Sequence, residues 1–395
     1  METWSAHLLF QAAEQKLDCA SAGNLKVYAQ RLARAGLPVI FSLRHLAQIT
    51  AVEYHFLRAT VDRYRESANY RMFAVKKRSG GRRHIHAVSR DLFKVQQYIN
   101  LELLQKIRPH PASYAFYSDG GIRKCASAHC GARWLFQYDL ENFFYSVNEI
   151  DVYSIFVNAG YRPLLAFELA RLCTTTRLPV YLQRYLWRTD IRKDYKFYSA
   201  RSNAIGVLPQ GSPSSPMLSN LSAFKLDEQL TNFADLHGFV YTRYADDLTI
   251  SASRALPDRM SIGEIQRKIV GIIRKTGFKE NKRKTRVAGP GSRKSVLGLL
   301  VDGTTPRLSR ETYKRIDRHL HAVDVYGPKA VADHEKFESV LGFYNHLAGL
   351  IAFVKDVDTV RWQEFHERFL NSSIKEPNDV DSGLTRATCT NWLEP

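Results

Sequence analysis

Two neighbouring carboxylates, Asp246 and Asp247, stand between two segments with the apolar and aromatic pattern of β-strands, 240–244 and 248–251. This pattern predicts a β-hairpin with both acids at its tip. Carboxylates side by side repel each other unless a cation neutralises them. Hard divalent ions such as Mg²⁺ do so through oxygen ligands and leave positions open for phosphate. An isolated Asp-Asp pair is more often a solvated turn, so a metal site needs a third carboxylate and a surface that handles phosphate.

Asp139 is the candidate third carboxylate. Residues 134–139 predict a strand in which Leu135, Gln137 and Asp139 share one face and aromatic side chains occupy the other. Asp139 falls where this alternation stops, so it would lie at the end of the strand. The alternative is an acid that caps the turn or helix that follows.

A cationic turn could handle the phosphate. Residues 71–88 predict a second hairpin that pivots on Gly80-Gly81. A cationic hairpin is suited to holding a triphosphate or a nucleic-acid backbone, although a solvated basic loop is an equally simple interpretation. The basic residues near this turn are Lys76, Lys77, Arg78, Arg82 and Arg83.

A Pro- and Gly-rich stretch at 206–223 could also contact a ligand. Gln210-Gly211 allows a close approach of the backbone, and Pro213 and Pro216 suit the entrance of a helix. The start of such a helix offers N–H groups and the positive end of a dipole. A tight loop without a ligand is the alternative.

The other segments are mostly helical and would position these residues. Residues 1–65 form short helices, either a docking element or a scaffold. Residues 110–132 form a loop in which aromatic residues alternate with glycines and basic residues, a mixture that suits base stacking. Helices are also predicted over 89–109, 150–188, 263–276 and 309–370, with a short strand over 295–301 and a polar tail from 371.

The composition points to a polyanionic partner. The 395 residues include 57 Lys and Arg against 39 Asp and Glu, a net charge of +18, and allow two or three domains. Nucleic acid is the leading partner and an acidic membrane surface the alternative. We expect no membrane-spanning segment and no signal peptide. The cysteines lack metal-ligand spacing and fit the reduced thiols of a cytoplasmic protein; they are Cys19, Cys125, Cys130, Cys173 and Cys389.

Three of these stretches, taken in order, resemble reverse transcriptases. They are Tyr244-Ala-Asp-Asp247, Asp139-Leu-Glu-Asn-Phe-Phe144 and Leu208-Pro-Gln-Gly-Ser-Pro-Ser-Ser-Pro216. The resemblance implies an α+β fold of the right-hand polymerase architecture, with fingers, an antiparallel palm sheet and a helical thumb. The implied parts are a helical segment at 1–65, fingers at 66–132, a palm at 133–295 with helices inserted between 150 and 205, a thumb at 296–370 and a tail at 371–395.

Within that family the chain is most similar to bacterial retron reverse transcriptases. Cys125-Ala-Ser-Ala-His129 resembles their Asn-Ala-x-x-His motif, and Val296-Leu-Gly298 resembles their Val-Thr-Gly motif. Cys125 and Leu297 each replace a hydrogen-bonding side chain. The resemblance implies that the chain copies a cognate structured non-coding RNA into RNA-linked DNA. It also implies that the RNA–DNA hybrid serves in anti-phage defence with an effector protein encoded nearby.

The resemblance also assigns roles to residues of this chain. Two Mg²⁺ ions would be held by Asp139, Leu140, Asp246 and Asp247, with the three aspartates catalytic and Asp247 supporting. Incoming dNTPs would contact Lys77, Arg82, Arg83, Phe144, Gln210, Gly211 and Lys284, and Phe144 would exclude a ribose 2′-hydroxyl. Candidate RNA contacts are Cys125, Ala126, His129, Val296, Leu297, Gly298, Arg310, Lys314 and Arg318.

Two other functions remain open at this stage. The chain could be another bacterial reverse transcriptase, of the group II-like or diversity-generating kind. It could also be an RNA-binding scaffold without activity, although a scaffold has no need of all three aspartates.

Overall fold

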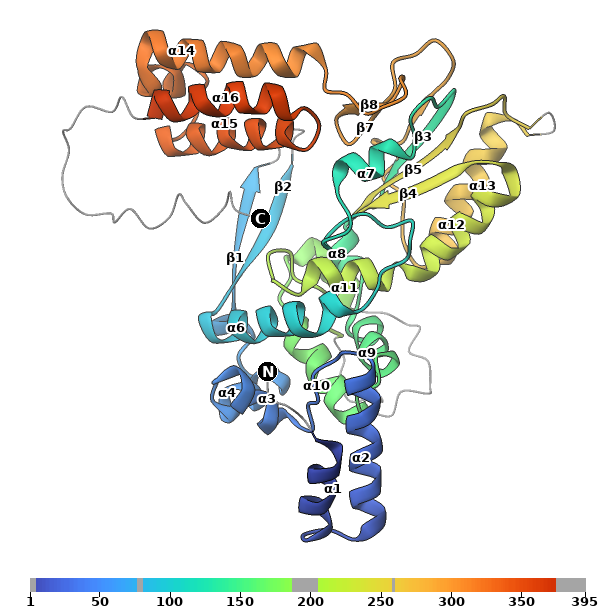
Figure 1. Cartoon of the computed structure of the whole chain (residues 1–395), viewed down its shortest axis with the longest axis vertical. Coiled ribbons are helices and arrows are strands. Elements are labelled where there is room, and N and C mark those ends of the chain that lie inside the picture. Colours follow the sequence, from blue (N-terminus) through green and yellow to red (C-terminus); the bar gives the residue numbers. More distant parts are fainter. Residues whose placement is uncertain (1–4, 77–80, 187–204, 258–259, 374–395) are drawn as a thin grey trace. The chain divides into compact units, whose positions relative to one another are not determined.

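The computed structural model describes residues 5–76, 81–186, 205–257 and 260–373 (Figure 1). The chain divides into two compact units, Met1–Leu297 and Gly298–Pro395. The predicted helical segment, fingers and palm all fall within the first unit, and the boundaries between them stay predictions. Among the described residues, no helix combines the length and the apolar character that crossing a bilayer requires.

The first unit begins with a helical layer. Apolar side chains of this layer, such as Leu32, Leu46 and Leu57, share one core with those of later helices between residues 90 and 222. The opening helices are therefore part of the scaffold that carries the rest of the unit. They are α1 (Ala6–Glu14), α2 (Cys19–Arg34), α3 (Leu43–Thr50), α4 (Tyr54–Val61) and α5 (Glu66–Asn69).

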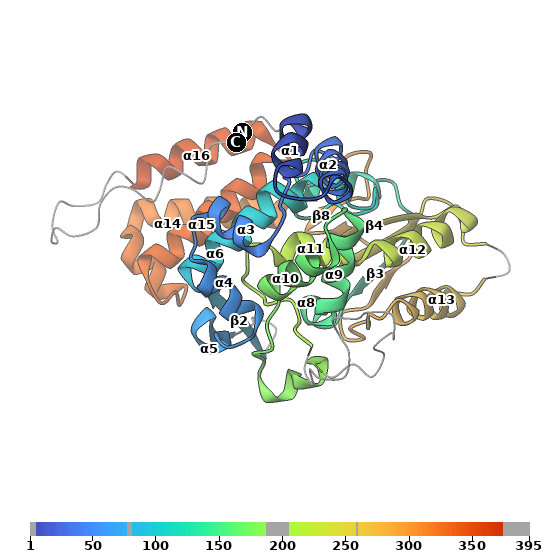
Figure 2. The same ribbon diagram turned by 90° about the horizontal axis from the view of Figure 1, so that it is seen from below.

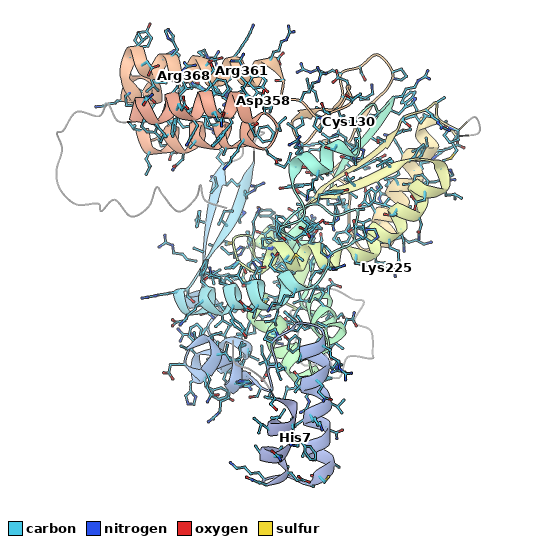
Figure 3. All side chains as sticks on the ribbon, viewed as in Figure 1. His7, Cys130, Lys225, Asp358, Arg361 and Arg368 are labelled. Atoms are coloured by element: carbon cyan, nitrogen blue, oxygen red, sulfur yellow. The ribbon has the colours of Figure 1, made fainter. Side chains whose placement is uncertain are left out.

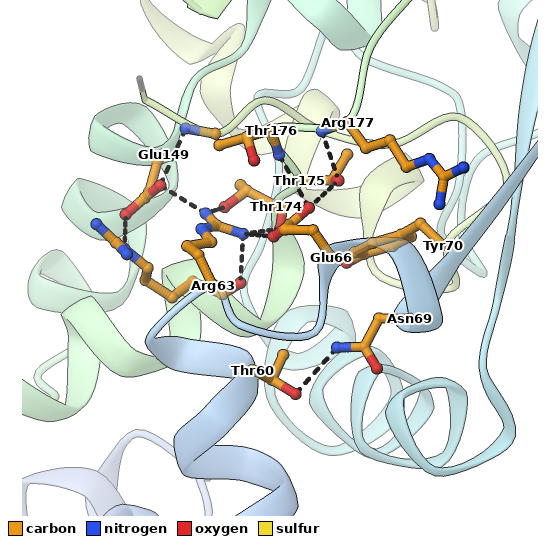
Figure 4. A network of polar contacts seen from close by, with 12 residues as sticks. Thr60, Arg63, Glu66, Asn69, Tyr70, Glu149, Thr174, Thr175, Thr176 and Arg177 are labelled. Carbon is orange, nitrogen blue, oxygen red and sulfur yellow. Dashed lines mark hydrogen bonds and ion pairs between the residues drawn. The ribbon is translucent and has the colours of Figure 1, made fainter. Parts of the chain in front are cut away.

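A buried polar network joins the opening helical layer to residues 149–206 (Figure 4). The Glu149 carboxylate, 1% exposed, accepts hydrogen bonds from Arg63 at 2.6 Å, Arg171 at 2.7 Å and the Gly206 N–H at 3.0 Å. A Cβ at Gly206 would lie 2.4 Å from the Arg63 guanidinium, so only glycine fits there. The network thereby anchors the segment that leads into the Gln210 loop.

The predicted hairpin of residues 71–88 forms as β1 (Tyr70–Lys76) and β2 (Arg82–Val88), which pair antiparallel. The amphipathic helix after it begins as α6 (Arg90–Tyr98), continues as a π-helical turn (Ile99–Leu103) and ends in a 3₁₀ turn (Leu104–Lys106). The helices that complete this half are α9 (Glu149–Asn158), α10 (Pro163–Cys173), the 3₁₀ segment Val180–Leu186 and α11 (Ser215–Ser222).

A four-stranded antiparallel sheet carries the site, in the order β4-β5-β3-β6. Its strands are β3 (Trp134–Asp139), β4 (Val240–Tyr244), β5 (Asp247–Ala252) and β6 (Arg286–Ala288). Phe136, Leu248 and Ile250 point into a core with helices α12 (Phe224–His237) and α13 (Ile262–Lys275). Because side chains alternate along a strand, Asp139, Asp247 and Thr249 lie on the opposite face.

The second unit is a group of three helices that follows the short strand β8 (Leu299–Leu300). They are α14 (Arg310–His334), interrupted at Gly327 (φ 78°), α15 (Val340–Lys355) and α16 (Thr359–Ser373). Arg368 pairs with Asp317 at 2.8 Å, and Tyr313 donates to Asp358 at 2.9 Å; Figure 3 labels Arg368 and Asp358. The helical prediction for 309–370 is confirmed.

The mixture of helices and antiparallel sheet is confirmed, and the right-hand arrangement stays a prediction. Two local predictions were wrong. The loop predicted over 110–132 contains a short helix, α7 (Ile122–Ser127), because Cys125 and Ala126 are buried. The strand predicted over 295–301 is broken between β7 (Ser295–Val296) and β8, since Leu297 and Gly298 have φ values of 50° and 85°.

Candidate active site

The two neighbouring aspartates occupy different parts of their hairpin. Tyr244 is the partner of Asp247 in the β4–β5 ladder, so the turn consists of Ala245 and Asp246, and Asp247 already belongs to β5. The prediction of both acids at the tip was therefore wrong for Asp247. Ala245 has a φ of 56°, an unfavourable conformation for alanine that the surrounding structure must hold.

The third aspartate lies directly opposite the second. Asp139 at the end of β3 is the register partner of Asp247, and both side chains are on the face of the sheet away from α12 and α13. The N–H of Leu140 donates to the Asp246 carbonyl at 2.9 Å, while the Leu140 side chain is buried. Strand pairing thus brings together three acids that are far apart in sequence.

Asp246 and Asp247 resist ionisation because they are partly buried and close to other carboxylates. Desolvation and the charge of Asp139 raise the pKa of Asp246. Desolvation, followed by the charges of Asp246 and Asp139, raises the pKa of Asp247 to about 6. Such a cluster is favourable at neutral pH only when a cation compensates it.

Lys284 and Asn281 supply part of this compensation. The Lys284 ammonium lies 2.5 Å from one Asp139 carboxylate oxygen, and the Asn281 amide donates to the other at 3.0 Å. Partial burial disfavours the ammonium, but the hydrogen bond and charge of Asp139 outweigh it and raise the pKa of Lys284. The sequence indicated a basic residue near the phosphates at 284; Asn281, a neutral residue in a basic segment, gave no such signal.

The donor set fits a hard divalent cation, although the aspartates are not arranged around one. Among the residues that the structure describes, no group of three or more His, Cys, Asp or Glu side chains is placed to hold a metal ion. Asp139 is directed instead to Lys284 and Asn281. The chemistry still fits, because carboxylate oxygens suit Mg²⁺ and the raised pKa of Asp247 reports negative charge that lacks a partner.

A fully buried ion pair contacts the turn between β4 and β5 that carries Asp246. The Arg243 guanidinium donates to both oxygens of Asp227, at 2.7 and 2.6 Å, and both side chains have no exposed surface. Its remaining N–H groups reach the carbonyls of Ala245 and Asn220, each at 3.1 Å. Arg243 therefore holds the strained residue next to Asp246. Neither Arg243 nor Asp227 was predicted from the sequence, although a charged residue inside an apolar strand was a signal.

The basic hairpin reaches the same face. Arg82 and Arg83 are exposed on β2, and the charge of Arg83 acts on Asp246. Lys77 lies outside the described residues. The His86 N–H donates to the Gln210 carbonyl at 2.7 Å, and a Cβ at Gly211 would lie 2.8 Å from the His86 carbonyl oxygen.

Gly211 therefore allows the Gln210 loop and β2 to touch, since a side chain there would separate them. The helix predicted after this loop is α11, with Pro216 in its first turn.

Phe144, the residue predicted to exclude a ribose 2′-hydroxyl, follows Asp139 by five positions in the chain. It belongs to the short helix α8 (Phe143–Ser146), which starts four residues after Asp139. Its ring lies 5.9 Å from that of Phe143 and 6.5 Å from that of Phe116. The ring is half-buried, so one part stays accessible to a ligand.

The predicted RNA contacts on α7 and in the turn after it are buried, and their side chains do not reach the surface. Cys125, Ala126 and His129 are at most 1% exposed. The His129 ring is 2.7 Å from both the Thr242 hydroxyl and the Ser251 hydroxyl, and the Cys125 sulfur is 3.2 Å from the Thr242 hydroxyl. These residues join α7 to the sheet, so a direct contact with RNA would require α7 to detach.

The buried His129 predicts a specific dependence of stability on pH. Burial lowers the pKa of His129 to about 4, while an unfolded histidine titrates near 6.5. The folded state therefore loses stability as the pH falls from 6.5 towards 4. We expect this residue to cost about 2 kcal/mol between pH 7 and pH 5. Urea unfolding at pH 7 and pH 5 measures this loss of unfolding free energy. His129→Gln should reduce the difference between the two pH values by about the same amount. An unchanged difference in the variant would contradict the role of His129.

The remaining predicted RNA contacts are mixed in exposure. Val296 is buried, Leu297 is half-buried and Gly298 is exposed. Arg310, Lys314 and Arg318 are all exposed on α14, as the four-residue spacing predicted. The exposed residues and the accessible part of Leu297 can touch a ligand without rearrangement, whereas Val296 cannot.

Comparison with known proteins defines the class to which this geometry belongs. Residues 75–301 match the family described as reverse transcriptase (RNA-dependent DNA polymerase). The match contains all three aspartates, the Gln210 loop and most of the basic hairpin, which supports the chemical interpretation of the site.

Curated relatives narrow the class. The chain is 33% identical to the retron Mx65 reverse transcriptase of Myxococcus xanthus, over 90% of this chain and 77% of the relative. It is 29% identical to the retron Ec86 reverse transcriptase of Escherichia coli, over 83% of this chain and 88% of the relative. The chain belongs to the retron reverse transcriptases and is an RNA-directed DNA polymerase.

Proposed function

We propose that this polymerase copies part of a cognate structured non-coding RNA into RNA-linked single-stranded DNA. The observation that carries the proposal is the pairing of Asp139 with Asp247 across β3 and β5, beside Asp246 in the turn. A template RNA and a DNA product follow from the family. The net charge of +18 suits such polyanions.

Asp139 and Asp246 would hold two Mg²⁺ ions, with Asp247 as a supporting charge and Leu140 beside them. Bound there, the ions would supply positive charge to the primer hydroxyl and to the departing pyrophosphate. The protein's own contribution is to position the reactants and to complement their charge.

The nucleotide would lie between the basic hairpin and the aspartates. Arg82 and Arg83, with Lys77, would bind its triphosphate, and the backbone at Gln210 and Gly211 would approach its base. Lys284, already paired with Asp139 at 2.5 Å, would remain a positive charge near the phosphates. These contacts need no nucleophilic side chain, because the attacking group is the primer hydroxyl.

Replacing Phe144 by alanine is expected to admit ribonucleotides. The half-buried ring would lie under the sugar, so its removal opens space for a 2′-hydroxyl. We expect the preference for dNTPs over rNTPs to fall by about tenfold or more in single-nucleotide extension assays. Phe144→Tyr keeps the ring and should keep the preference. An unchanged preference in Phe144→Ala would remove the ring from this role.

The biological role that we propose is anti-phage defence in the cytoplasm, together with an effector protein encoded nearby. Membership of the retron family supports it. The exposed row Arg310, Lys314 and Arg318 would follow the template–product duplex through its phosphates.

Sequencing the nucleic acid that co-purifies with the protein tests the proposal. We expect one RNA species joined to DNA through a 2′,5′ branch. A DNA product without a branch would instead favour a priming mode unlike that proposed. Absence of any bound RNA or DNA, combined with failure to extend a primer, would refute the proposal.

A further inference from the structure

A groove runs along α13, on the face of the sheet opposite to the aspartates. It has a volume of about 520 Å³; α13 forms one wall, residues 280–285 form the other, and Tyr138 lies at its base. Figure 1 and Figure 2 both show α13 at the edge of the first unit. The Lys284 side chain extends from residues 280–285 to Asp139. This segment therefore lies between the groove and the catalytic aspartates.

The groove is cationic. Arg267 on α13 and Lys282 on the opposite wall are exposed, and neither has an ion-pair partner within the described part of the chain. Glu280, the acid in the lining, is buried and takes both of its hydrogen bonds from Arg274. The acid is thus already neutralised by a direct ion pair. Arg267 and Lys282 act on Glu264 and Glu280 only as nearby charges, so both cations can still pair with a ligand.

A buried hydroxyl at the base also lacks a partner. Tyr138 is 2% exposed, and its hydroxyl makes no hydrogen bond to any described residue. An unpaired buried hydroxyl is costly, so such a group indicates a missing partner. A phenol can donate to a phosphate oxygen or exchange hydrogen bonds with a ribose hydroxyl or a water. Because the Tyr138 hydroxyl is buried, such a contact requires a small opening at the base of the groove.

The wall of the groove formed by α13 leaves room for a ligand to approach the helix closely. Gly263 and Gly271 are two helical turns apart on α13, and an added Cβ at either position would meet no atom within 4 Å. Glycine weakens a helix, and neither position has the positive φ that would require it. Their small size keeps the groove open along its length.

We propose that this groove binds the sugar–phosphate backbone of the structured RNA that the polymerase carries, away from the catalytic aspartates. The inference rests on the proposed function in one respect, namely that the chain holds such an RNA. Guanidinium and ammonium groups from two walls suit a polyanion, and an apolar ligand would leave both of them unpaired. The RNA would then stay bound on one face of the sheet while DNA is made on the other.

Charge reversal in the groove tests the proposal. The variant Arg267→Glu with Lys282→Glu is compared with Lys268→Glu with Lys275→Glu, which makes the same charge change at exposed residues of α13 outside the groove lining. The probe is a labelled RNA hairpin with single-stranded flanks, followed by fluorescence anisotropy across a salt series. We expect the affinity of the groove variant for the hairpin to fall about tenfold. The slope of the logarithm of its binding constant against the logarithm of the salt concentration should become smaller in magnitude by about 1.5. Equal losses in both variants would overturn the proposal.

Filling the groove with a side chain gives a second test, whose expected result cannot be explained by misfolding. Gly271→Leu should raise the melting temperature, because the helix gains a better former and the side chain enters open space. The same variant should bind the hairpin several-fold more weakly. Unchanged affinity would overturn the proposal.

Extension of a short DNA primer on a simple RNA template separates the two hypotheses. All groove variants should extend this substrate as the unaltered protein does. Failure of the unaltered protein would refute the proposed function itself. Normal extension together with normal hairpin binding by the groove variants would refute only the groove.

Discussion

Replacing Asp246 and Asp247 together by asparagine is expected to reduce DNA synthesis by at least about a thousandfold. The amides keep the size of the side chains but remove the charge on which cation binding depends. Extension of a DNA primer on an RNA template measures the loss. RNA affinity should change little, because in the proposed mechanism the aspartates contact the reacting nucleotide and not the rest of the RNA. Normal extension by the double variant would rule out the proposed mechanism.

Stability separates this effect from misfolding. The pKa of Asp247 is raised to about 6, so its charge costs stability once the pH rises above the unfolded value near 4. The asparagine variant should therefore melt at the same temperature as the parent near pH 4 and at a higher temperature above pH 6. Added Mg²⁺ should raise the melting temperature of the parent but not of the variant. Glu228→Gln with Asp235→Asn is the matched control, since it neutralises two exposed acids on α12.

Breaking the buried pair of Arg243 and Asp227 is expected to cost about 3–5 kcal/mol of unfolding free energy. Asp227→Asn leaves a guanidinium with no exposed surface and no counter-charge, and it weakens the acceptor for the Tyr241 hydroxyl at 2.8 Å. Most domains have only about 5–15 kcal/mol to lose, so the variant should be strongly destabilised in urea unfolding. A change below about 1 kcal/mol would contradict the geometry.

Removing both charges distinguishes stability from positioning. Arg243→Met with Asp227→Leu should recover part of the stability lost in Asp227→Asn, because no orphan charge remains, while the Tyr241 hydroxyl and two carbonyls still lose their partners. Primer extension should stay at least about tenfold low, since the Ala245 carbonyl loses its donor and the turn that carries Asp246 is no longer held. We expect kcat to fall and KM for the nucleotide to change little. Full activity in this stable variant would exclude a positioning role.

The residues proposed to act directly could be singled out from the sequence, and most of the residues that position them could not. Alternation along residues 134–139 places Asp139 at the end of a strand, and the basic hairpin is evident from its cations around two glycines. The pairing of Asp139 with Asp247 depends on which strands become neighbours, a long-range choice that local pattern does not encode. For the same reason Asp227 could not be matched to Arg243.

Short elements depended on packing in the same way. The helix α7 has only six residues in a segment rich in glycine and aromatic residues, so local propensity predicts a loop. It forms because Cys125 and Ala126 are buried and His129 finds partners on β4 and β5. The break at Leu297 and Gly298 was likewise hidden inside an apolar run.

The buried position of Cys125 and His129 bears on how RNA preference could be exchanged between relatives. Transplanting this motif from one relative to another would alter how a helix is joined to a sheet, and the recipient would change in stability rather than in choice of RNA. We therefore expect exchanges intended to redirect the enzyme to another RNA to succeed only at side chains that solvent already reaches. The buried motif and the exposed residues proposed as RNA contacts are thus separable design targets.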